Sequence, residues 1–197
     1  MKLIVNGQNL DITIENEKTV GDVLKAFEAE AAKNKATTIG IKLNGKEIPA
    51  DDFENAIKES IKEDTIIELS VISQSDIKAS FEESKKSFTE LSENLKEIPV
   101  LLQSCKDKEA NQKISELANE IEKFCRTSTL AALFPEIYSK LKIDGKELTD
   151  FFEEFAPILK DFEDALENKD SVTIGDLAEY EIAPRLEKMS AAVSALD

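Results

Sequence analysis

The chain has 197 residues, and its 41 acidic and 25 basic side chains give it a formal net charge of −16 at pH 7. Because nucleic acids and anionic membranes attract basic surfaces, this charge argues against either of them as the main partner. The sequence contains no histidine, which excludes Ser-His-Asp triads, Cys-His dyads and HExxH zinc sites.

The first third of the chain has the two-residue hydrophobic period of β-strands. Apolar and polar residues alternate over residues 1–5 and again over residues 10–15, with Asn6-Gly7 between them. Two such runs joined by a glycine-containing turn predict a hairpin. The alternation returns over residues 39–43, before a second turn at Asn44-Gly45, and in a last strand over residues 65–72.

A helix and a short amphipathic segment separate these strands. Thr19 and Asp22 have the spacing of a capping box, so we expect a helix to follow Thr19. A shorter amphipathic segment runs over residues 52–61. The expected apolar stripe of the helix comprises Val20, Val23, Leu24, Phe27 and Ala31.

This order of elements resembles the ubiquitin-like β-grasp fold. The resemblance rests on the opening hairpin, the capped helix after Thr19, the turn within residues 41–48 and the closing strand at residues 64–69. It covers residues 1–73. Ubiquitin and the sulfur carriers of this fold act through a C-terminal Gly-Gly, whereas here the last strand continues into Ser73-Gln74 and a further domain. The resemblance therefore implies a docking domain without Gly-Gly conjugation chemistry.

In the β-grasp pattern, the alternation assigns each strand residue to one face of the sheet. The resemblance implies that the outer face is the recognition surface, with Ile4, Lys42 and Ile66 as partner-binding residues. The alternative is that the helical half folds back onto Ile4 and Ile66. The residues expected to face the helix are Met1, Leu3, Val5, Ile12, Ile14, Ile41, Leu43, Ile67, Leu69 and Val71. Those expected to face outward are Lys2, Ile4, Asn6, Thr13, Lys42, Ile66 and Glu68.

After Ser75 the hydrophobic period changes to 3.6 residues, which predicts helices. The connections are short, so we expect an acidic antiparallel bundle of four to five helices over residues 76–197. The first helix is expected to end near Cys105. The expected fold class is therefore α+β: a β-grasp domain at residues 1–73 followed by the helical bundle.

Several residues are expected to begin or bend these helices. Thr149 or Asp150 can cap the fourth helix, and Thr173 with Asp176 has capping-box spacing for the last one. Prolines 99 and 135 fit first turns of helices, whereas prolines 157 and 184 predict kinks because proline removes a backbone hydrogen bond.

Cys105 and Cys125 both continue apolar stripes, which favours core packing over a nucleophilic role. In an antiparallel helix hairpin the two cysteines lie roughly 20 Å apart at 1.5 Å per residue. A disulfide spans a Cα separation of no more than about 7 Å. We therefore expect two unbonded thiols.

Phe151 and Phe152 point about 100° apart on one helix, so the apolar stripe there is wider than a single packed face requires. One interpretation is a helix packed between two neighbours. The other is a groove for a partner or a dimer seam at Phe151 and Phe152.

No motif in the sequence predicts a metal, a cofactor or a catalytic residue. The glycines form neither a GxGxxG nor a P-loop arrangement, and no DxDxDG calcium loop occurs. Carboxylates are abundant, and a solvated helix face accounts for them.

We therefore expect a non-enzymatic cytoplasmic protein that binds another protein as an adaptor or assembly factor. The cytoplasmic expectation rests on the three-residue apolar run at the N-terminus, which is too short for a signal-peptide core. One alternative is a secretion or flagellar-export type chaperone, a role that suits small, acidic, helical chains. The other is an enzyme that uses carboxylates alone.

Overall fold

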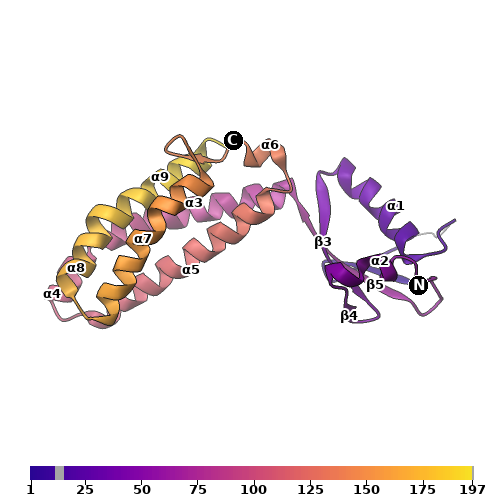
Figure 1. Cartoon of the computed structure of the whole chain (residues 1–197), viewed down its shortest axis with the longest axis horizontal. Coiled ribbons are helices and arrows are strands. Elements are labelled where there is room, and N and C mark those ends of the chain that lie inside the picture. Colours follow the sequence, from indigo (N-terminus) through magenta and orange to yellow (C-terminus); the bar gives the residue numbers. More distant parts are fainter. Residues whose placement is uncertain (12–15, 197) are drawn as a thin grey trace. The chain divides into compact units, whose positions relative to one another are not determined.

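The computed structural model describes residues 1–11 and 16–196 (Figure 1). The chain divides into two units, Met1–Asp76 and Ile77–Asp197, and the protein is α+β: a mixed sheet comes first and helices follow. The expectations for Ile12, Thr13 and Ile14 lie outside the described residues. None of the helices over the described ranges is both long enough and apolar enough to span a membrane.

The first unit contains a five-stranded mixed sheet in the order β2-β1-β5-β3-β4. The central strand β5 runs parallel to β1 and antiparallel to β3, while β1 with β2 and β3 with β4 form antiparallel hairpins. The strands are β1 (Lys2–Val5), β2 (Gln8–Leu10), β3 (Ala36–Leu43), β4 (Lys46–Glu47) and β5 (Ile66–Ser73).

Helix α1 (Val20–Lys33) packs on one face of this sheet. The predicted capping box is confirmed, since the Thr19 hydroxyl accepts from the Asp22 N–H and the Asp22 carboxylate accepts from the Thr19 N–H. The core beneath the helix consists of Leu3, Val20, Val23, Leu24, Leu43, Ile67 and Leu69, with Met1, Val5, Phe27, Ile41 and Val71 packed against it. For the described residues, the predicted helix-facing set is therefore confirmed.

Two asparagines, Asn6 and Asn44, form hydrogen bonds to the backbone of β5 near its two ends. Asn6 and Asn44 each have positive φ and precede a glycine with positive φ, which is the conformation of a type I′ hairpin turn. The Asn6 amide donates to the Val71 carbonyl at 3.0 Å and accepts from the Val71 N–H at 2.9 Å. The Ile66 N–H donates to the Asn44 side-chain oxygen at 2.9 Å, and the Asn44 N–H donates to the Ile66 carbonyl. Asn6 therefore binds the backbone of β5 instead of presenting a free outward-facing side chain.

Strand β3 contains a bulge that sequence periodicity does not reveal. Thr38 pairs with Val71 and Gly40 pairs with Ser70, so Ile39 between them has no partner on β5. Because a bulge shifts the alternation by one residue, Ile39 does not share the buried face of Leu43 and is 45% exposed. The expected amphipathic segment at residues 52–61 is shorter than predicted: η1 (Ala50–Asp52) and α2 (Phe53–Ala56).

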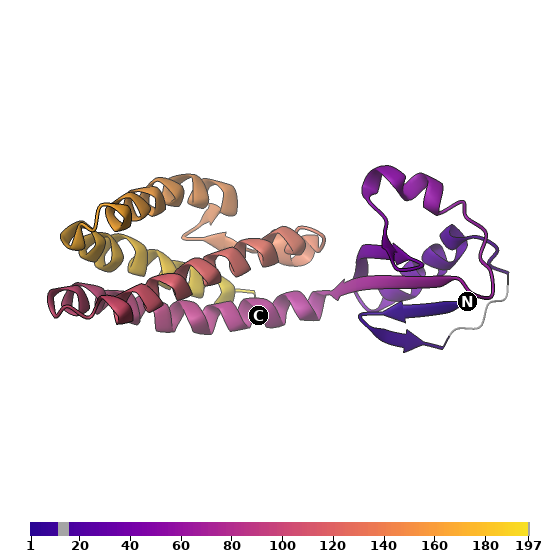
Figure 2. The same ribbon diagram turned by 90° about the horizontal axis from the view of Figure 1, so that it is seen from below.

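The second unit is formed mainly by three long helices and their shorter neighbours (Figures 1 and 2). The elements are α3 (Gln74–Lys96), α4 (Ile98–Gln103), α5 (Asp107–Ala131), α6 (Pro135–Tyr138), β6 (Lys142–Ile143), β7 (Lys146–Glu147), α7 (Leu148–Glu167), α8 (Ser171–Asp176), the π-helical segment η2 (Leu177–Ile182) and α9 (Ala183–Ser194).

The proline positions determine where two of these helices start. Pro99 lies in the first turn of α4 and Pro135 in that of α6, as predicted. The single helix expected to reach Cys105 is instead interrupted at Glu97, because the Pro99 ring has no N–H to donate to the Leu95 carbonyl. Pro157 lies inside α7.

Two of the predicted caps are wrong. Helix α7 begins at Leu148, after Glu147 and before Thr149. Helix α8 is capped by Asp170, whose carboxylate accepts from the Thr173 N–H at 3.1 Å and from its hydroxyl at 2.7 Å. An aspartate is as good an N-cap as a threonine, and Asp170 follows directly on the turn that ends α7.

The last predicted kink, at Pro184, appears as a change of helix type. Proline at position 184 cannot donate to the carbonyl of Tyr180, so the α-helical pattern cannot continue through it. Residues Leu177–Ile182 adopt π-helical bonding instead, and the Ala183 N–H donates to the carbonyl of Ala178. Helix α9 then starts with Pro184 in its first turn.

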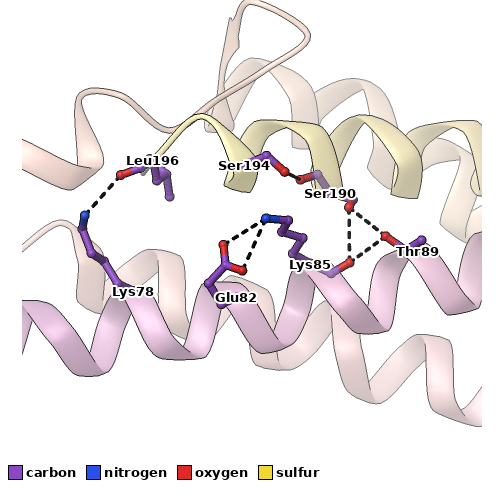
Figure 3. Close-up of polar contacts among 7 residues, drawn as sticks. All are labelled: Lys78, Glu82, Lys85, Thr89, Ser190, Ser194 and Leu196. Atoms are coloured by element: carbon purple, nitrogen blue, oxygen red, sulfur yellow. Dashed lines mark hydrogen bonds and ion pairs between the residues drawn. The ribbon is translucent and has the colours of Figure 1, made fainter.

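Polar contacts along α3 fix its alignment with two neighbours. Against α5 they join Ser80 to Thr127 at 2.8 Å and Lys123 to Glu83 at 2.9 Å, so α3 and α5 run antiparallel (Figure 2). Against α9, the Ser190 hydroxyl lies 3.0 Å from that of Thr89 and donates to the Lys85 carbonyl (Figure 3). At the end of the chain, the Lys78 ammonium donates to the Leu196 carbonyl.

Replacing Asn6 by glycine tests how much its side chain stabilises β5. Glycine adopts positive φ readily, so Asn6→Gly removes the two bonds to Val71 and leaves the turn conformation intact. We expect a loss of about 1–2 kcal/mol in the free energy of opening at Val71, measured by native-state amide hydrogen exchange.

The matched control is Asp144→Gly, in the type I′ turn between β6 and β7. The Asp144 carboxylate pairs with the exposed Lys188 ammonium, and within residues 1–11 and 16–196 it accepts no bond from a strand backbone. This variant should leave exchange at Val71 unchanged. Equal exchange rates at Val71 in Asn6→Gly and in the unaltered chain would show that the Asn6 side-chain amide does not stabilise β5.

Candidate functional site

The outer face of the sheet brings together the three residues predicted to bind a partner. Ile4, Lys42 and Ile66 lie on β1, β3 and β5, each next in sequence to a residue of the buried core. Lys42 is exposed, and the two isoleucines are half-buried. Leu3 and Ile67 belong to the buried core of this unit. Because side chains alternate between the two faces of a strand, Ile4 and Ile66 lie on the face opposite α1.

Cross-strand register shows how these side chains are grouped. Ile4 lies opposite Glu68 on β5, and Lys42 lies opposite Glu68 from the other side. Ile66 lies opposite Lys2, which makes Ile4 and Ile66 diagonal neighbours, close enough for long side chains to touch. The outer face thus has two adjacent isoleucines bordered by Lys2, Lys42 and Glu68. We call these five residues the outer-face cluster.

Phe151 and Phe152 lie in an aromatic cluster that joins three helices. The ring of Phe124 on α5 lies 5.5 Å from Phe81 and 5.3 Å from Phe88, both on α3. It also lies 6.4 Å from Phe152 on α7. Phe151 is only 5% exposed, and its ring contacts those of Phe152 and Phe155.

The wide apolar stripe of α7 thus packs against other side chains of the second unit. Tilted and edge-on ring pairs at these separations stabilise a core beyond their buried area. The interpretation of Phe151 as a partner-groove residue is wrong, since its ring is not available at the surface. The interpretation as a helix packed between neighbours fits both side chains.

The two cysteines are unbonded, as predicted, but only one packs as expected. Cys125 is half-buried, and burial raises the pKa of its thiol. Cys105 is exposed, with φ of 56°. It follows α4 in a Schellman motif, in which the Cys105 N–H donates to the Leu102 carbonyl and the Lys106 N–H to the Leu101 carbonyl. The backbone conformation of this helix end turns Cys105 out of the apolar stripe.

Five carboxyl groups in the described residues have a pKa below the ordinary value. Hydrogen bonds to the charged form are the main cause. The donors are chiefly the Lys18 N–H for Asp22, the Ser73 hydroxyl for Asp76, the Lys123 ammonium for Glu83, the Lys188 ammonium for Asp144 and the Thr173 hydroxyl for Asp170. Over residues 1–11 and 16–196, no three acidic or cysteine side chains converge as metal ligands do.

Comparison with known proteins gives two matches to family models. Residues 1–73 match the TP0873 N-terminal domain, and residues 79–192 match a domain of unknown function, DUF8042. The second match spans more than half of the chain. This chain belongs to the DUF8042 family.

A similar protein comes from Treponema pallidum (strain Nichols), where it is described as an uncharacterised protein. It is 32% identical to this DUF8042 protein over 197 residues, which is 100% of this chain and 98% of the relative. The likeness thus extends through both units. No solved structure matches the chain.

Sequence reasoning missed an exposed apolar pair at one end of the second unit. Helices α4 and α8 pack against each other (Figure 1), and Gly175 allows this contact because an added Cβ would lie 3.1 Å from the Pro99 Cγ. Val100 on α4 is 63% exposed and Val172 on α8 is 71% exposed. The available signal was their position outside the apolar stripes, but short helices have too few turns for a stripe to be recognised.

The two thiols of this DUF8042 protein should react at different rates. Thiolate is the reactive form, so exposure favours Cys105, while burial and a raised pKa protect Cys125. We expect iodoacetamide at pH 8 to modify Cys105 at least about tenfold faster, measured by mass spectrometry of tryptic peptides.

The variants Cys105→Ser and Cys125→Ser assign the two phases of this reaction. Cys105→Ser should abolish the fast phase and Cys125→Ser should leave it unchanged. A fast phase that survives in Cys105→Ser would contradict the exposure of the Schellman turn.

Proposed function

We propose that this protein is a non-catalytic interaction protein of the cytoplasm, an adaptor or assembly factor that binds a protein partner through its first unit. In this proposal the first unit is a ubiquitin-like β-grasp domain and the second an antiparallel helical bundle. The strand order, with β5 central and parallel to β1, is compatible with a β-grasp.

One observation carries the proposal: Ile4 and Ile66 are neighbours on the face of the sheet opposite the core. Covering an apolar side chain on such a face with a partner is favourable by about 25 cal/mol for each Å² of apolar surface removed from water. Lys2, Lys42 and Glu68 around them can fix the orientation of a partner through charge complementarity. A protein partner with an apolar centre and a mixed-charge border fits this arrangement.

The proposal excludes conjugation chemistry of the ubiquitin type. The last strand, β5, ends at Ser73 and α3 begins at Gln74. The Ser73 hydroxyl donates to the Asp76 carboxylate at 2.6 Å, and the Asp76 N–H donates back to this hydroxyl. The residues after the sheet are thus ordered as a helix N-terminus, not as an extended Gly-Gly tail that an enzyme could adenylate.

The double variant Ile4→Ser/Ile66→Ser in the full chain tests the outer-face cluster. The tagged chain and the variant are used to recover partners from native lysate, and recovered proteins are quantified by mass spectrometry. We expect specific partners to fall at least about tenfold, since two buried isoleucines contribute more than the 1.4 kcal/mol that a tenfold change requires. Circular dichroism should show the variant folded, because neither side chain belongs to the core.

The control is Val100→Ser/Val172→Ser, which removes two exposed apolar side chains from the second unit. It should leave recovery through the outer-face cluster unchanged. The proposal is wrong if the folded Ile4→Ser/Ile66→Ser variant recovers the same partners in the same amounts as the unaltered chain.

A further inference from the structure

The geometry points to a second binding site in the first unit, at the free edge of β3. There we infer that an extended peptide with basic side chains binds as an added strand. This site is separate from the outer-face cluster, and it requires neither that cluster nor its partner.

Half of β3 has an open edge. Strand β4 pairs only with Lys42 and Leu43, and the Ile48 N–H donates to the Ile41 carbonyl just before them. Among the described residues, no strand pairs with Ala36–Gly40 on the edge that faces away from β5. A free strand edge offers backbone donors and acceptors to an extended chain.

A groove of about 480 Å³ runs beside this edge. Most of the residues that line it are apolar, and the lining comes from α1, β3 and the segment around η1 and α2. Ile39 and Phe53 are two of its borders, and their side chains are 45% and 39% exposed.

Glu28 occupies the position that a peptide backbone would take. Its carboxylate accepts from the Thr38 N–H at 2.9 Å and from the Thr37 hydroxyl at 3.4 Å. The Thr38 hydroxyl is buried and has no hydrogen-bond partner, although buried polar atoms are normally paired. A peptide carbonyl that replaced the carboxylate at Thr38 would leave Glu28 free to pair with a basic side chain, and a peptide N–H could satisfy the hydroxyl.

The charge around the groove selects a basic peptide. Glu28 is the one charged residue among the described lining. Between the lining residues Ala50 and Phe53 lie Asp51 and Asp52, and Glu54 follows; all three are exposed. An extended peptide presents alternate side chains to the same side, so apolar residues can fill the groove while Lys or Arg residues meet these carboxylates.

Random nine-residue peptides displayed on phage and selected against the biotinylated full chain provide the test. We expect the enriched sequences to alternate apolar residues with Lys or Arg. The most enriched peptide is then synthesised, and its Kd is measured by isothermal titration calorimetry. Bound peptide should slow hydrogen exchange at the amides of residues 36–40 and give cross-strand nuclear Overhauser effects to β3.

Three variants separate the parts of the site. Ile39→Ser removes an exposed apolar border, and Asp51→Lys/Asp52→Lys reverses the rim charge; each should raise Kd at least about tenfold. Glu28→Gln keeps an oxygen acceptor for Thr38 but removes the charge. It should therefore raise the Kd of peptides that carry Lys or Arg and leave the Kd of uncharged peptides unchanged. The control Glu63→Lys/Asp64→Lys reverses an equally exposed acidic pair outside the groove and should change Kd less than about twofold.

Four results would overturn the inference. They are the absence of any enriched peptide, enrichment of acidic or helical peptides, a Kd that Ile39→Ser leaves unchanged, and self-association that Ile39→Ser abolishes, which would make a second copy the occupant. A peptide that loses affinity only in Ile4→Ser/Ile66→Ser binds the outer-face cluster. That result would reject the β3 site and support the proposed function.

Discussion

The attachment of both hairpin turns to the central strand is the interaction on which the first unit depends. Strand β5 has β1 on one side and β3 on the other, and each neighbouring hairpin contributes an asparagine that bonds to its backbone. Asn44 fixes the start of β5 at Ile66, and Asn6 fixes it further along at Val71. Because one residue of slip exchanges the two faces of a strand, these bonds also determine which side chains form the core.

Both candidate sites follow from that register. With β5 fixed, Ile67 and Leu69 enter the core beneath α1, and Ile66 must lie on the opposite face beside Ile4. The same register leaves Ile39 as the extra residue of β3. Its bulge shifts the pairing of β3 with β5 beside the part of the β3 edge that β4 does not cover. The groove next to Phe53 and the apolar outer face therefore both follow from one strand alignment.

Local patterns predicted the strands, the capped helix and the outer face, because each depends on residues close in sequence. The Thr19 capping box and the placement of Ile4 are of this kind. The bulge at Ile39 depends on pairing with a strand some thirty residues later, which periodicity cannot show. The exposure of Cys105 depends on the left-handed end of α4, and a thiol at that position gives no signal of such a turn. The burial of Phe151 could be predicted only by knowing which helices enclose α7.

The two Asn-Gly turns also make the first unit susceptible to deamidation of their asparagines. A glycine after asparagine leaves the backbone nitrogen open to attack on the side-chain amide, and the resulting succinimide hydrolyses to aspartate or isoaspartate. At Asn6 this would replace an amide that donates to the Val71 carbonyl by a carboxylate that repels it. In the Asp144-Gly145 turn a carboxylate is already present and pairs with Lys188. Deamidation of Asn6 would therefore loosen the attachment of the first hairpin to β5.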